Sequence, residues 1–417
     1  MRILHIIHRY PPAQGGSEKY FEEISKRFAQ RGDSVEVWTT DADQLERFWI
    51  RDRKRLPAGV SMDEGVTVRR FRTVVVPQHA RVQRLLCLLP SQNLRRLFHF
   101  PSPLVPGMIR RAAMEPLQFD VVHATALPYT SILYAAWIAA RRSAARLCYT
   151  PFMHIGEKHS DEVRKWYARR DQIQLLQKAD AIFVQTPTER DFLISCGLDG
   201  SKCLITGVGV NPEEIVPPKP IENLMCERYG LRPPYVFTLG AKSLDKGTLS
   251  VIEAMARVWQ QHPEVTLVLA GDEMSDFQEY WGTVPSESKK SILNLGRISD
   301  AEKVDLIRQG LIYLNPSRTD SFGITFLEAW LWEKPVIGAR AGGVVDVISH
   351  GEDGFLVEFG CASEIASKIL ELIRNPSMQA SMGAKGKTKT LSKYTWEAIF
   401  ESIGKRYQSV VKSLRHA

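Results

Sequence analysis

The sequence contains no hydrophobic run long enough to cross a membrane. Its nearest approach, residues 131–140, is roughly half of the ~20 residues that a transmembrane helix needs, and it ends in Arg141 and Arg142. The amino terminus passes from Met1 straight into a strand-like segment, 3–7, without the apolar core and cleavage site of a secretory leader. We therefore expect neither a membrane span nor a signal peptide.

Cysteine is scarce, and no two cysteines have Cys-x-x-Cys spacing. The six thiols are scattered along the chain, at Cys87, Cys148, Cys196, Cys203, Cys226 and Cys361. This usage predicts reduced, mostly buried thiols in a cytoplasmic protein. Metal-ligand spacing is also missing, because His154, Glu157 and His159 do not form His-Glu-x-x-His and no Asp or Cys group completes the set. We therefore expect no metal site.

Acidic residues are absent between Glu64 and Glu115, although the net charge of +8 is modest. The segment interleaves apolar pieces at 85–89 and 97–100 with arginines, which are Arg69, Arg70, Arg72, Arg81, Arg84, Arg95, Arg96, Arg110 and Arg111. This pattern suits an anionic membrane surface or an anionic acceptor better than a nucleic acid. A solvated basic loop with apolar anchors fits equally well. We expect a cytoplasmic protein without a nucleic-acid partner, and peripheral membrane attachment through Arg69–Arg111 stays open.

Strand and helix patterns alternate along the chain. The apolar fraction of 44% and the charged fraction of 24% are those of a globular protein, and a length of 417 residues favours two domains. Strand patterns occupy 2–7, 34–39, 66–71, 119–123, 146–150, 181–185, 235–239, 265–269, 292–295, 311–314, 336–338 and 355–357. Helical patterns between them include 18–31, 131–142 and 161–178. The alternation predicts an α/β fold with doubly wound parallel sheets.

A proline cluster separates the two series of strands. Pro212, Pro217, Pro218 and Pro220 lie close together, which is typical of a linker. We place an N-terminal domain at 1–210 and a C-terminal domain at 211–394. The last helical pattern, 396–414, is amphipathic, and we expect residues 395–417 to pack back on the N-terminal domain.

The stretch Asn315–Trp332 joins a strand end, a polar turn and an unusually apolar helix. From Gly323 the pattern is apolar on every side, which predicts a buried helix, yet it carries Glu328. A buried carboxylate needs a partner because desolvating it alone is costly. With Asp320 in the preceding loop, the backbone N–H groups at the helix start could hold a polyhydroxylated anion. Those N–H groups belong to Phe322, Gly323, Ile324 and Thr325.

Three further loops follow predicted strands, where open α/β sheets bind ligands. Gly15 and Gly16 precede a helix and could approach phosphate, although an ordinary turn would look the same. Lys242 and Lys246 could offset a diphosphate or lie in a solvated turn. His154 ends another strand, with a structural histidine as the alternative. The chain contains neither G-x-G-x-x-G nor a P-loop, which disfavours nicotinamide and ATPase chemistry.

The motifs in this order resemble those of the retaining nucleotide-sugar glycosyltransferases of family 4. The resemblance spans nearly the whole chain and is densest from 299 to 376. It rests on Pro-x-x-x-Gly-Gly-x-Glu at 11–18, Phe-Asp-Val-Val-His at 119–123, the strand-end His154, Ala179-Asp180 with Thr186, Gly-Val-Gly-Val at 207–210, Lys246-Gly247, Pro316-Ser317 to Glu328, Val-Val-Asp-Val-Ile at 344–348, and Gly351-x-x-Gly354.

The resemblance implies the GT-B fold, in which two doubly wound Rossmann-like domains face each other across a cleft. The N-terminal domain would bind the acceptor and the C-terminal domain the nucleotide sugar. Glu328 would bind the donor ribose, and Asp320 would contact the transferred sugar with help from the N–H groups of 322–325. The nucleotide sugar is a substrate, so no cofactor is implied.

The resemblance also assigns roles outside the Asn315–Trp332 stretch. Lys246 would bind the diphosphate, and Gly16, beside Gly15, would approach it from the N-terminal domain. His154 would lie next to the reacting carbon. Arg297 and Ile298 would border the base through their backbone.

Two departures from the family pattern affect these roles. The family has a glutamate where this chain has Asp320, which is one methylene shorter and bears on sugar preference. The family arginine five residues before the lysine is replaced by Ala241, followed by Lys242. Lys242 is the candidate substitute, although an ammonium lacks the guanidinium fork.

The expected activity is transfer of a sugar, with retention, from a UDP-, GDP- or other nucleotide sugar to an acceptor hydroxyl. Polysaccharide, glycolipid or other glycoconjugate synthesis fits this activity, and the acceptor could be a lipid-linked or glycan precursor. Two alternatives stay open: a non-catalytic nucleotide-sugar-binding protein, and a nucleotide-sugar epimerase on the same architecture.

Overall fold

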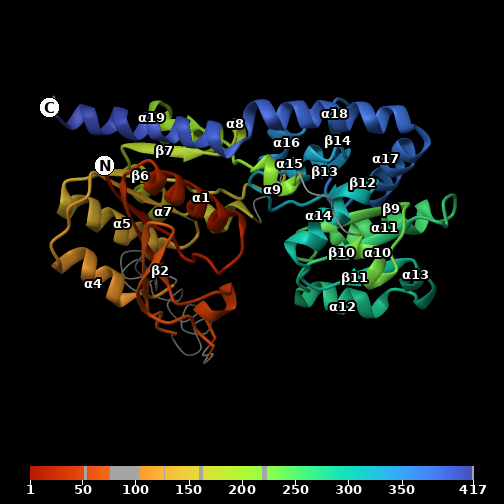
Figure 1. Ribbon diagram of the computed structural model, residues 1–417, viewed down its shortest axis with the longest axis horizontal. Coiled ribbons are helices and arrows are strands. Elements are labelled where there is room, and N and C mark those ends of the chain that lie inside the picture. The colour runs from red at the N-terminus through yellow and green to blue at the C-terminus, as the bar shows by residue number, and fades with distance from the viewer. Residues whose placement is uncertain (51–53, 76–102, 126, 159–162, 218–222, 416–417) are drawn as a thin grey trace.

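The protein is described by a computed structural model over residues 1–50, 54–75, 103–125, 127–158, 163–217 and 223–415 (Figure 1). Within these ranges the strands form two separate sheets, one from each half of the chain. We call them the N-terminal sheet and the C-terminal sheet. Most of the basic segment, 76–102, lies outside the described residues, as do His159, Pro218 and Pro220.

The N-terminal sheet has the strand order β3-β4-β2-β1-β5-β6-β7-β8. Every pair is parallel except β3 with β4. Its strands are β1 (Arg2–Ile6), β2 (Ser34–Thr40), β3 (Gly59–Asp63), β4 (Val66–Phe71), β5 (Val121–Ala124), β6 (Arg146–Tyr149), β7 (Ala181–Val184) and β8 (Cys203–Ile205). The six strands predicted here are present. The sequence analysis missed β3 and β8, which are edge strands with few buried apolar residues and therefore no clear apolar pattern.

The C-terminal sheet has the order β11-β10-β9-β12-β13-β14, and all its pairs are parallel. All six of its strands match predicted ones within one or two residues. They are β9 (Tyr235–Leu239), β10 (Thr266–Ala270), β11 (Ile292–Leu295), β12 (Ile312–Asn315), β13 (Val336–Ala339) and β14 (Gly354–Val357). Strands such as β12 and β13 are buried along their whole length, which explains their continuous apolar sequence.

Helices cover both sheets, as the doubly wound prediction requires. In the N-terminal half they are α1 (Gly16–Gln30), α4 (Pro106–Met114), α5 (Thr130–Ser143), α6 (Arg164–Tyr167), α7 (Arg170–Leu176) and α8 (Pro187–Ser195), with short 3₁₀ turns at Leu45–Phe48 and Gly200–Lys202. In the C-terminal half they are α9 (Pro212–Ile215), α10 (Leu224–Tyr229), α11 (Thr248–Val258), α12 (Ser275–Thr283), α13 (Ser286–Lys290), α14 (Asp300–Gln309), α15 (Ile324–Leu331), α16 (Val344–Val347), α17 (Ala362–Arg374) and α18 (Pro376–Lys393).

Within its described part, the helical pattern over 161–178 corresponds to two helices, α6 and α7, and not to one continuous helix. Arg169 has an extended backbone (φ −65°, ψ 148°) and separates α6 from α7. Its N–H donates to Gln172 Oε1 over 2.9 Å, which starts a new helix instead of continuing the old one. The helical periodicity is therefore interrupted by a local cap.

The chain crosses between the two halves twice at one place. Val210, near the end of the N-terminal half, exchanges backbone hydrogen bonds with Tyr394 and Trp396 over 2.9 and 3.2 Å. The chain then returns as α19 (Trp396–Arg415), which packs on α1 and β7 (Figure 1). Among the described helices, none combines the length and the apolar character needed to span a bilayer.

A buried hydrogen-bond network ties α19 to the centre of the N-terminal sheet. The Tyr407 hydroxyl lies 3.2 Å from His5 Nε2 and 2.5 Å from His123 Nδ1. Burial lowers the pKa of His5 to about 3 and holds the pKa of His123 well below its ordinary value, so both rings are neutral. A neutral imidazole can both donate and accept, which satisfies these buried groups without a charge.

Candidate active site

The loops at the carboxyl ends of the two sheets touch each other. The N–H of Gly342, after β13, donates to the carbonyl oxygen of Gly156, after β6, over 2.9 Å. Beside it, Arg318 Nη1, after β12, pairs with Glu157 Oε1 at 3.3 Å. The carboxyl ends of parallel strands are where ligands bind in open α/β sheets. The two halves therefore bring their ligand-binding edges together.

The helix start predicted from the sequence is present at the end of β12. Gly323 caps α15 with φ 87°, and a side chain there would also collide with the Phe326 ring, at 2.5 Å from an added Cβ. The first turn closes with the N–H of Phe326 on the Gly323 carbonyl oxygen. The N–H groups of Phe322, Gly323, Ile324 and Thr325 make no hydrogen bond to any described residue. These four N–H groups without acceptors form a row of hydrogen-bond donors that suits an anion.

Asp320, Lys246 and His154 come together beside this helix start. Lys246 Nζ lies 2.7 Å from Asp320 Oδ1, and Asn315 Nδ2 donates to Asp320 Oδ2 over 2.8 Å. Burial alone would raise the pKa of Asp320, but the Lys246 ammonium and the Asn315 amide outweigh it and hold that pKa below its ordinary value. Burial lowers the pKa of His154 to about 4, and the positive charge of Lys246 adds to the effect. The ring is therefore neutral and stacks on Tyr167 at 4.7 Å.

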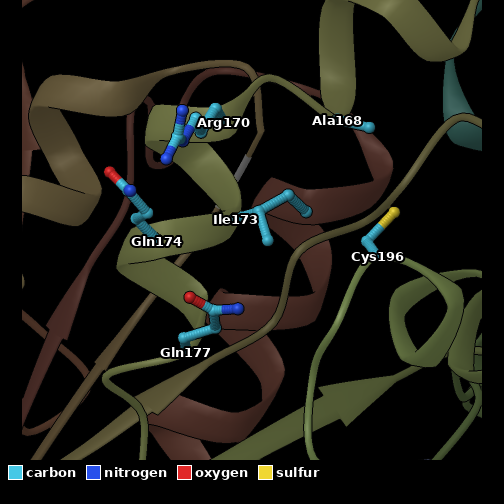
Figure 2. Close-up of a pocket in the computed structure, with 6 residues that line it drawn as sticks. All are labelled: Ala168, Arg170, Ile173, Gln174, Gln177 and Cys196. Carbon is cyan, nitrogen blue, oxygen red and sulfur yellow. The ribbon is translucent and has the colours of Figure 1, made fainter.

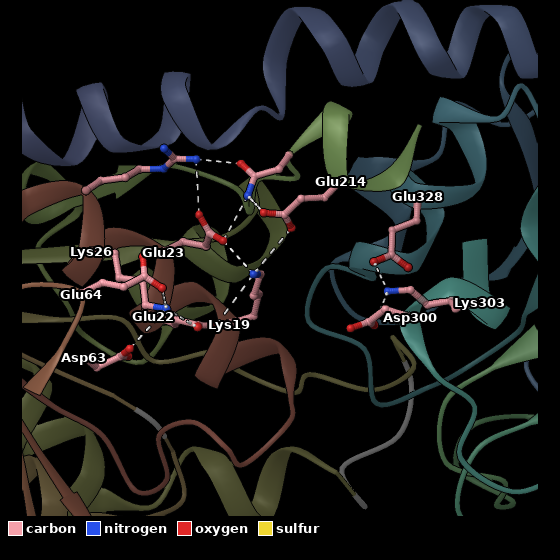
Figure 3. Close-up of polar contacts among 12 residues, drawn as sticks. Lys19, Glu22, Glu23, Lys26, Asp63, Glu64, Glu214, Asp300, Lys303 and Glu328 are labelled. Carbon is pink, nitrogen blue, oxygen red and sulfur yellow. Dashed lines mark hydrogen bonds and ion pairs between the residues drawn. The ribbon is translucent and has the colours of Figure 1, made fainter. Parts of the chain in front are cut away.

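Glu328 is buried on α15, as its apolar surroundings predicted. It is 8% exposed, and its Oε1 lies 3.0 Å from the Nζ of Lys303 on α14 (Figure 3). The second oxygen, Oε2, is buried without a hydrogen-bond partner among the described residues. A carboxylate oxygen in this state can accept a hydroxyl of a ligand.

Gly16 approaches the same helix start from the N-terminal half. A Cβ added to Gly16 would lie 3.5 Å from Ile324 Cδ1, so its backbone faces α15 directly. A Cβ on Gly15 would meet the Glu18 carboxylate, which is held by Arg9 at 2.5 Å and by His8 at 3.3 Å. A side chain at Gly15 would therefore interfere with this carboxylate, whereas a Cβ at Gly16 would make only an ordinary van der Waals contact with Ile324.

Lys242 is not brought to this cluster. Its side chain is 1% exposed, and its ammonium donates to Asn294 Oδ1 over 2.5 Å and to the Leu295 carbonyl oxygen over 2.7 Å, and lies 3.2 Å from Glu273. Desolvation lowers the pKa of Lys242. The expectation that Lys242 substitutes for the family arginine therefore differs from the structure, because the ammonium is buried among acceptors of its own domain.

Arg297 and Ile298 lie beyond β11, at the same edge of the C-terminal sheet. Arg297 is half exposed and binds both oxygens of Asp272 through Nε, over 2.8 and 2.9 Å. Ile298 is partly buried against the core. Both stay predictions as base contacts.

Glu189 is a positioning group that the sequence analysis missed. It lies on α8, is 1% exposed, and accepts the N–H of Met153 over 2.9 Å and that of Gln185 over 2.6 Å. Phe152, between His154 and the end of β6, has φ 49°, a left-handed conformation that costs about 1–3 kcal/mol. Glu189 thus holds the strained loop that carries His154. Only its four-residue spacing from Gln185 could have suggested the contact.

A pocket of about 460 Å³ lies elsewhere in the N-terminal half (Figure 2). It is lined by Ala168, Arg170, Ile173, Gln174, Gln177 and Cys196. None of the predicted site residues lines it.

Within the described ranges, histidine, cysteine and acidic side chains nowhere gather in a group of three or more suited to a metal ion.

Two family models together cover most of the chain. Residues 15–209 match the glycosyl transferase 4-like domain, and residues 228–389 match the glycosyl transferases group 1. The chain belongs to the group 1 glycosyltransferases. It is a nucleotide-sugar-dependent glycosyltransferase with the GT-B fold, as its resemblance to family 4 predicted.

Similar glycosyltransferases include the D-inositol 3-phosphate glycosyltransferase of Thermobifida fusca, 25% identical over 96% of this chain and 90% of that protein. The trehalose synthase of Pyrococcus horikoshii is 30% identical over 52% of this chain and 54% of its own length. Among solved structures, sucrose-phosphate synthase of Thermosynechococcus elongatus has a TM-score of 0.74 at 17% identity, over 99% of this chain and 100% of that one. HepE of Anabaena, in complex with UDP-glucose, has a TM-score of 0.71 at 20% identity, over 98% and 100%. The two structures establish the fold alone.

Proposed function

We propose that this glycosyltransferase moves a sugar from a nucleotide diphosphate sugar to an acceptor hydroxyl with retention at the anomeric carbon. The observation that carries the proposal is the cluster of Lys246, Asp320 and His154 beside the unpaired N–H groups at the start of α15. Positive charge and backbone donors lie where a diphosphate needs them, next to acceptors suited to sugar hydroxyls.

The donor would lie along the carboxyl edge of the C-terminal sheet. The ribose hydroxyls donate to Glu328, and the sugar hydroxyls donate to Asp320. The diphosphate lies against Lys246 and the N–H groups of residues 322–325, with Gly16 facing it from the N-terminal half. Arg297 and Ile298 border the base. Lys242 contributes to the donor site only by stabilising the loop that carries Lys246.

In the transfer step, the bond between the anomeric carbon and the phosphate oxygen breaks as a bond to the acceptor oxygen forms on the same face. The acceptor proton passes to the leaving phosphate oxygen. Lys246 and the start of α15 stabilise the charge that develops on the diphosphate, which is electrostatic preorganisation. Because these groups supply positive charge themselves, the proposal includes no metal. The neutral His154 lies beside the reacting carbon and can donate to or accept from the sugar.

The domain assignments follow the same division. We propose that residues 1–210 with the helix at 395–417 form the acceptor side, and that 211–394 bind the donor. UDP-sugars are the first donors to test, because HepE binds UDP-glucose. A phosphorylated polyol or a lipid-linked or glycan precursor is the acceptor class to test. The proposal also includes a cytoplasmic location and peripheral attachment to an anionic membrane surface through the segment Arg69–Arg111.

Substitution of Glu328 by alanine tests the assignment. Thermal stabilisation by a panel of UDP-, GDP- and other nucleotide sugars identifies the donor that the wild type binds. We expect Glu328→Ala to lose that stabilisation and to weaken donor binding by roughly 100-fold, on the order of a buried charge-assisted contact. Near-wild-type binding and turnover in the variant would show that the donor lies elsewhere.

Two measurements separate the alternatives. Donor hydrolysis or sugar transfer by the purified protein excludes a non-catalytic binding protein. NMR of the donor with enzyme and without acceptor detects any epimerised sugar, which would exclude the transferase as the primary activity.

A further inference from the structure

Lys303 supplies the counter-charge of the buried Glu328 carboxylate. It lies in the first half of α14, and its Nζ is 3.0 Å from Glu328 Oε1 and 3.8 Å from Asp300 Oδ1 (Figure 3). The side chain of Lys303 is 25% exposed and that of Asp300 is 95% exposed. Glu328 is therefore the principal partner, because the exposed and distant Asp300 is screened by water.

The pairing uses only one side of the Glu328 carboxylate. Its Oε2 is buried and has no partner among the described residues. An ionised carboxylate has about four lone-pair sites, so one ammonium on Oε1 leaves room for two hydroxyl donors. Removal of the ammonium would leave a buried negative charge without compensation, which costs more than the pair itself contributes.

The neighbouring cation Lys19 has acidic partners of its own. The charge of Lys19, on α1 of the N-terminal half, acts on Lys303, but Lys19 Nζ pairs with Glu23 at 2.8 Å and lies 3.8 Å from Glu214 (Figure 3). Burial and the charge of Lys19 lower the pKa of Lys303, but the opposite effect of Glu328 and Asp300 is larger. The pKa therefore lies above its ordinary value, and the ammonium stays charged at neutral pH.

We propose that Lys303 is a positioning residue for the donor ribose: its ammonium anchors Glu328 Oε1 and so directs Oε2 and the remaining lone pairs at the ribose diol. The inference rests on the proposed role of Glu328 as the ribose anchor. Lys303 acts through Glu328, and it makes donor affinity depend on the ribose hydroxyls specifically.

The test compares nucleotides with and without the diol. Binding of UDP and GDP, and of their 2′,3′-dideoxy forms, is measured by calorimetry on the full chain. We expect Lys303→Met to weaken the ribonucleotide that binds the wild type by roughly tenfold or more, and the dideoxy form by less than about threefold. Lys303→Arg should restore most of the affinity. Lys303→Gln, which keeps a donor without the charge, serves if the methionine variant does not fold.

The matched control is Lys290, which pairs with Glu287 at 2.6 Å on the exposed surface of α13. Lys290→Met removes a lysine–glutamate pair of the same domain without touching Glu328, and we expect no change in binding. Equal losses for ribose and dideoxy nucleotides, or no loss at all, would overturn the role of Lys303. If the wild type binds neither UDP nor GDP, the proposed donor assignment fails first, and the inference falls with it.

Discussion

Most charged side chains at the candidate site come from the C-terminal half, whereas the N-terminal loops contribute backbone groups, a neutral ring and Glu157, which pairs with Arg318. Lys246, Asp320 and Glu328 come from the C-terminal half. Gly16 and the neutral His154 come from the N-terminal half. In the proposed arrangement the charged diphosphate lies against the C-terminal half, which carries these charged side chains.

The same contrast exists within one loop of the C-terminal half. Lys246 is 30% exposed and faces Asp320, while Lys242 is 1% exposed and donates its hydrogen bonds to acceptors of its own domain. Two lysines of one short motif therefore have different surroundings, and we expect Lys246 to reach a ligand and Lys242 to stabilise the loop. The predictions below test this division.

The largest expected effect is that of Lys246→Ala. Removing a cation aimed at the leaving diphosphate should lower kcat by about 100- to 1,000-fold, or ~3–4 kcal/mol of transition-state stabilisation. Donor affinity should fall as well, because the ground-state diphosphate is also charged. Steady-state kinetics and donor titration measure both effects. Lys246→Arg is the charge-preserving control, and an alanine variant with wild-type kinetics would contradict the role.

Lys242→Met should affect stability instead of donor binding. It removes an ammonium that satisfies Asn294 and the Leu295 carbonyl oxygen, and we expect a loss of about 2–3 kcal/mol in the free energy of unfolding. Urea denaturation measures this loss. Donor affinity of the folded variant should stay within about twofold of the wild type. A selective loss of donor affinity with unchanged stability would return Lys242 to the diphosphate site.

A smaller effect in free energy, about tenfold in turnover, is expected from Glu189→Gln, which tests the N-terminal side. The amide nitrogen would point an N–H at the N–H of Met153 or Gln185, so the loop carrying His154 should shift. We expect kcat to fall by about tenfold with unchanged affinity for the free nucleotide, because the proposed nucleotide site lies in the other half. Equal changes in both quantities would indicate general damage instead of misplacement of the loop.

Glu189 also predicts a pH dependence of stability. Desolvation outweighs the two backbone N–H groups and raises its pKa from 4.5 to about 7. The folded protein therefore holds this proton more tightly than the unfolded chain does, so the contribution is full below pH 4.5 and is lost as the pH rises through about 7. Unfolding curves between these values should show this slope in the wild type and lack it in Glu189→Gln.

Much of the fold was predictable because parallel strands buried on both faces have continuous apolar sequences. That signal located six strands in each half and the amphipathic helices between them. It failed at β3 and β8, where exposed edges carry no apolar pattern, and it did not show the break at Arg169, where a local cap separates α6 from α7. The site residues on loops were predictable only where their type was unusual for its place, as with Glu328 in an apolar helix.

The α/β alternation, the family, and the acids and glycines at the strand ends could be predicted from the sequence, since these depend on local pattern and order. Tertiary structure alone decided which groups meet. Lys303 lies on another helix from Glu328, Glu189 lies on another element from His154, and Lys242 turns into the domain while Lys246 turns toward Asp320. Side-chain partners across elements depend on packing and burial, which a one-dimensional spacing does not encode.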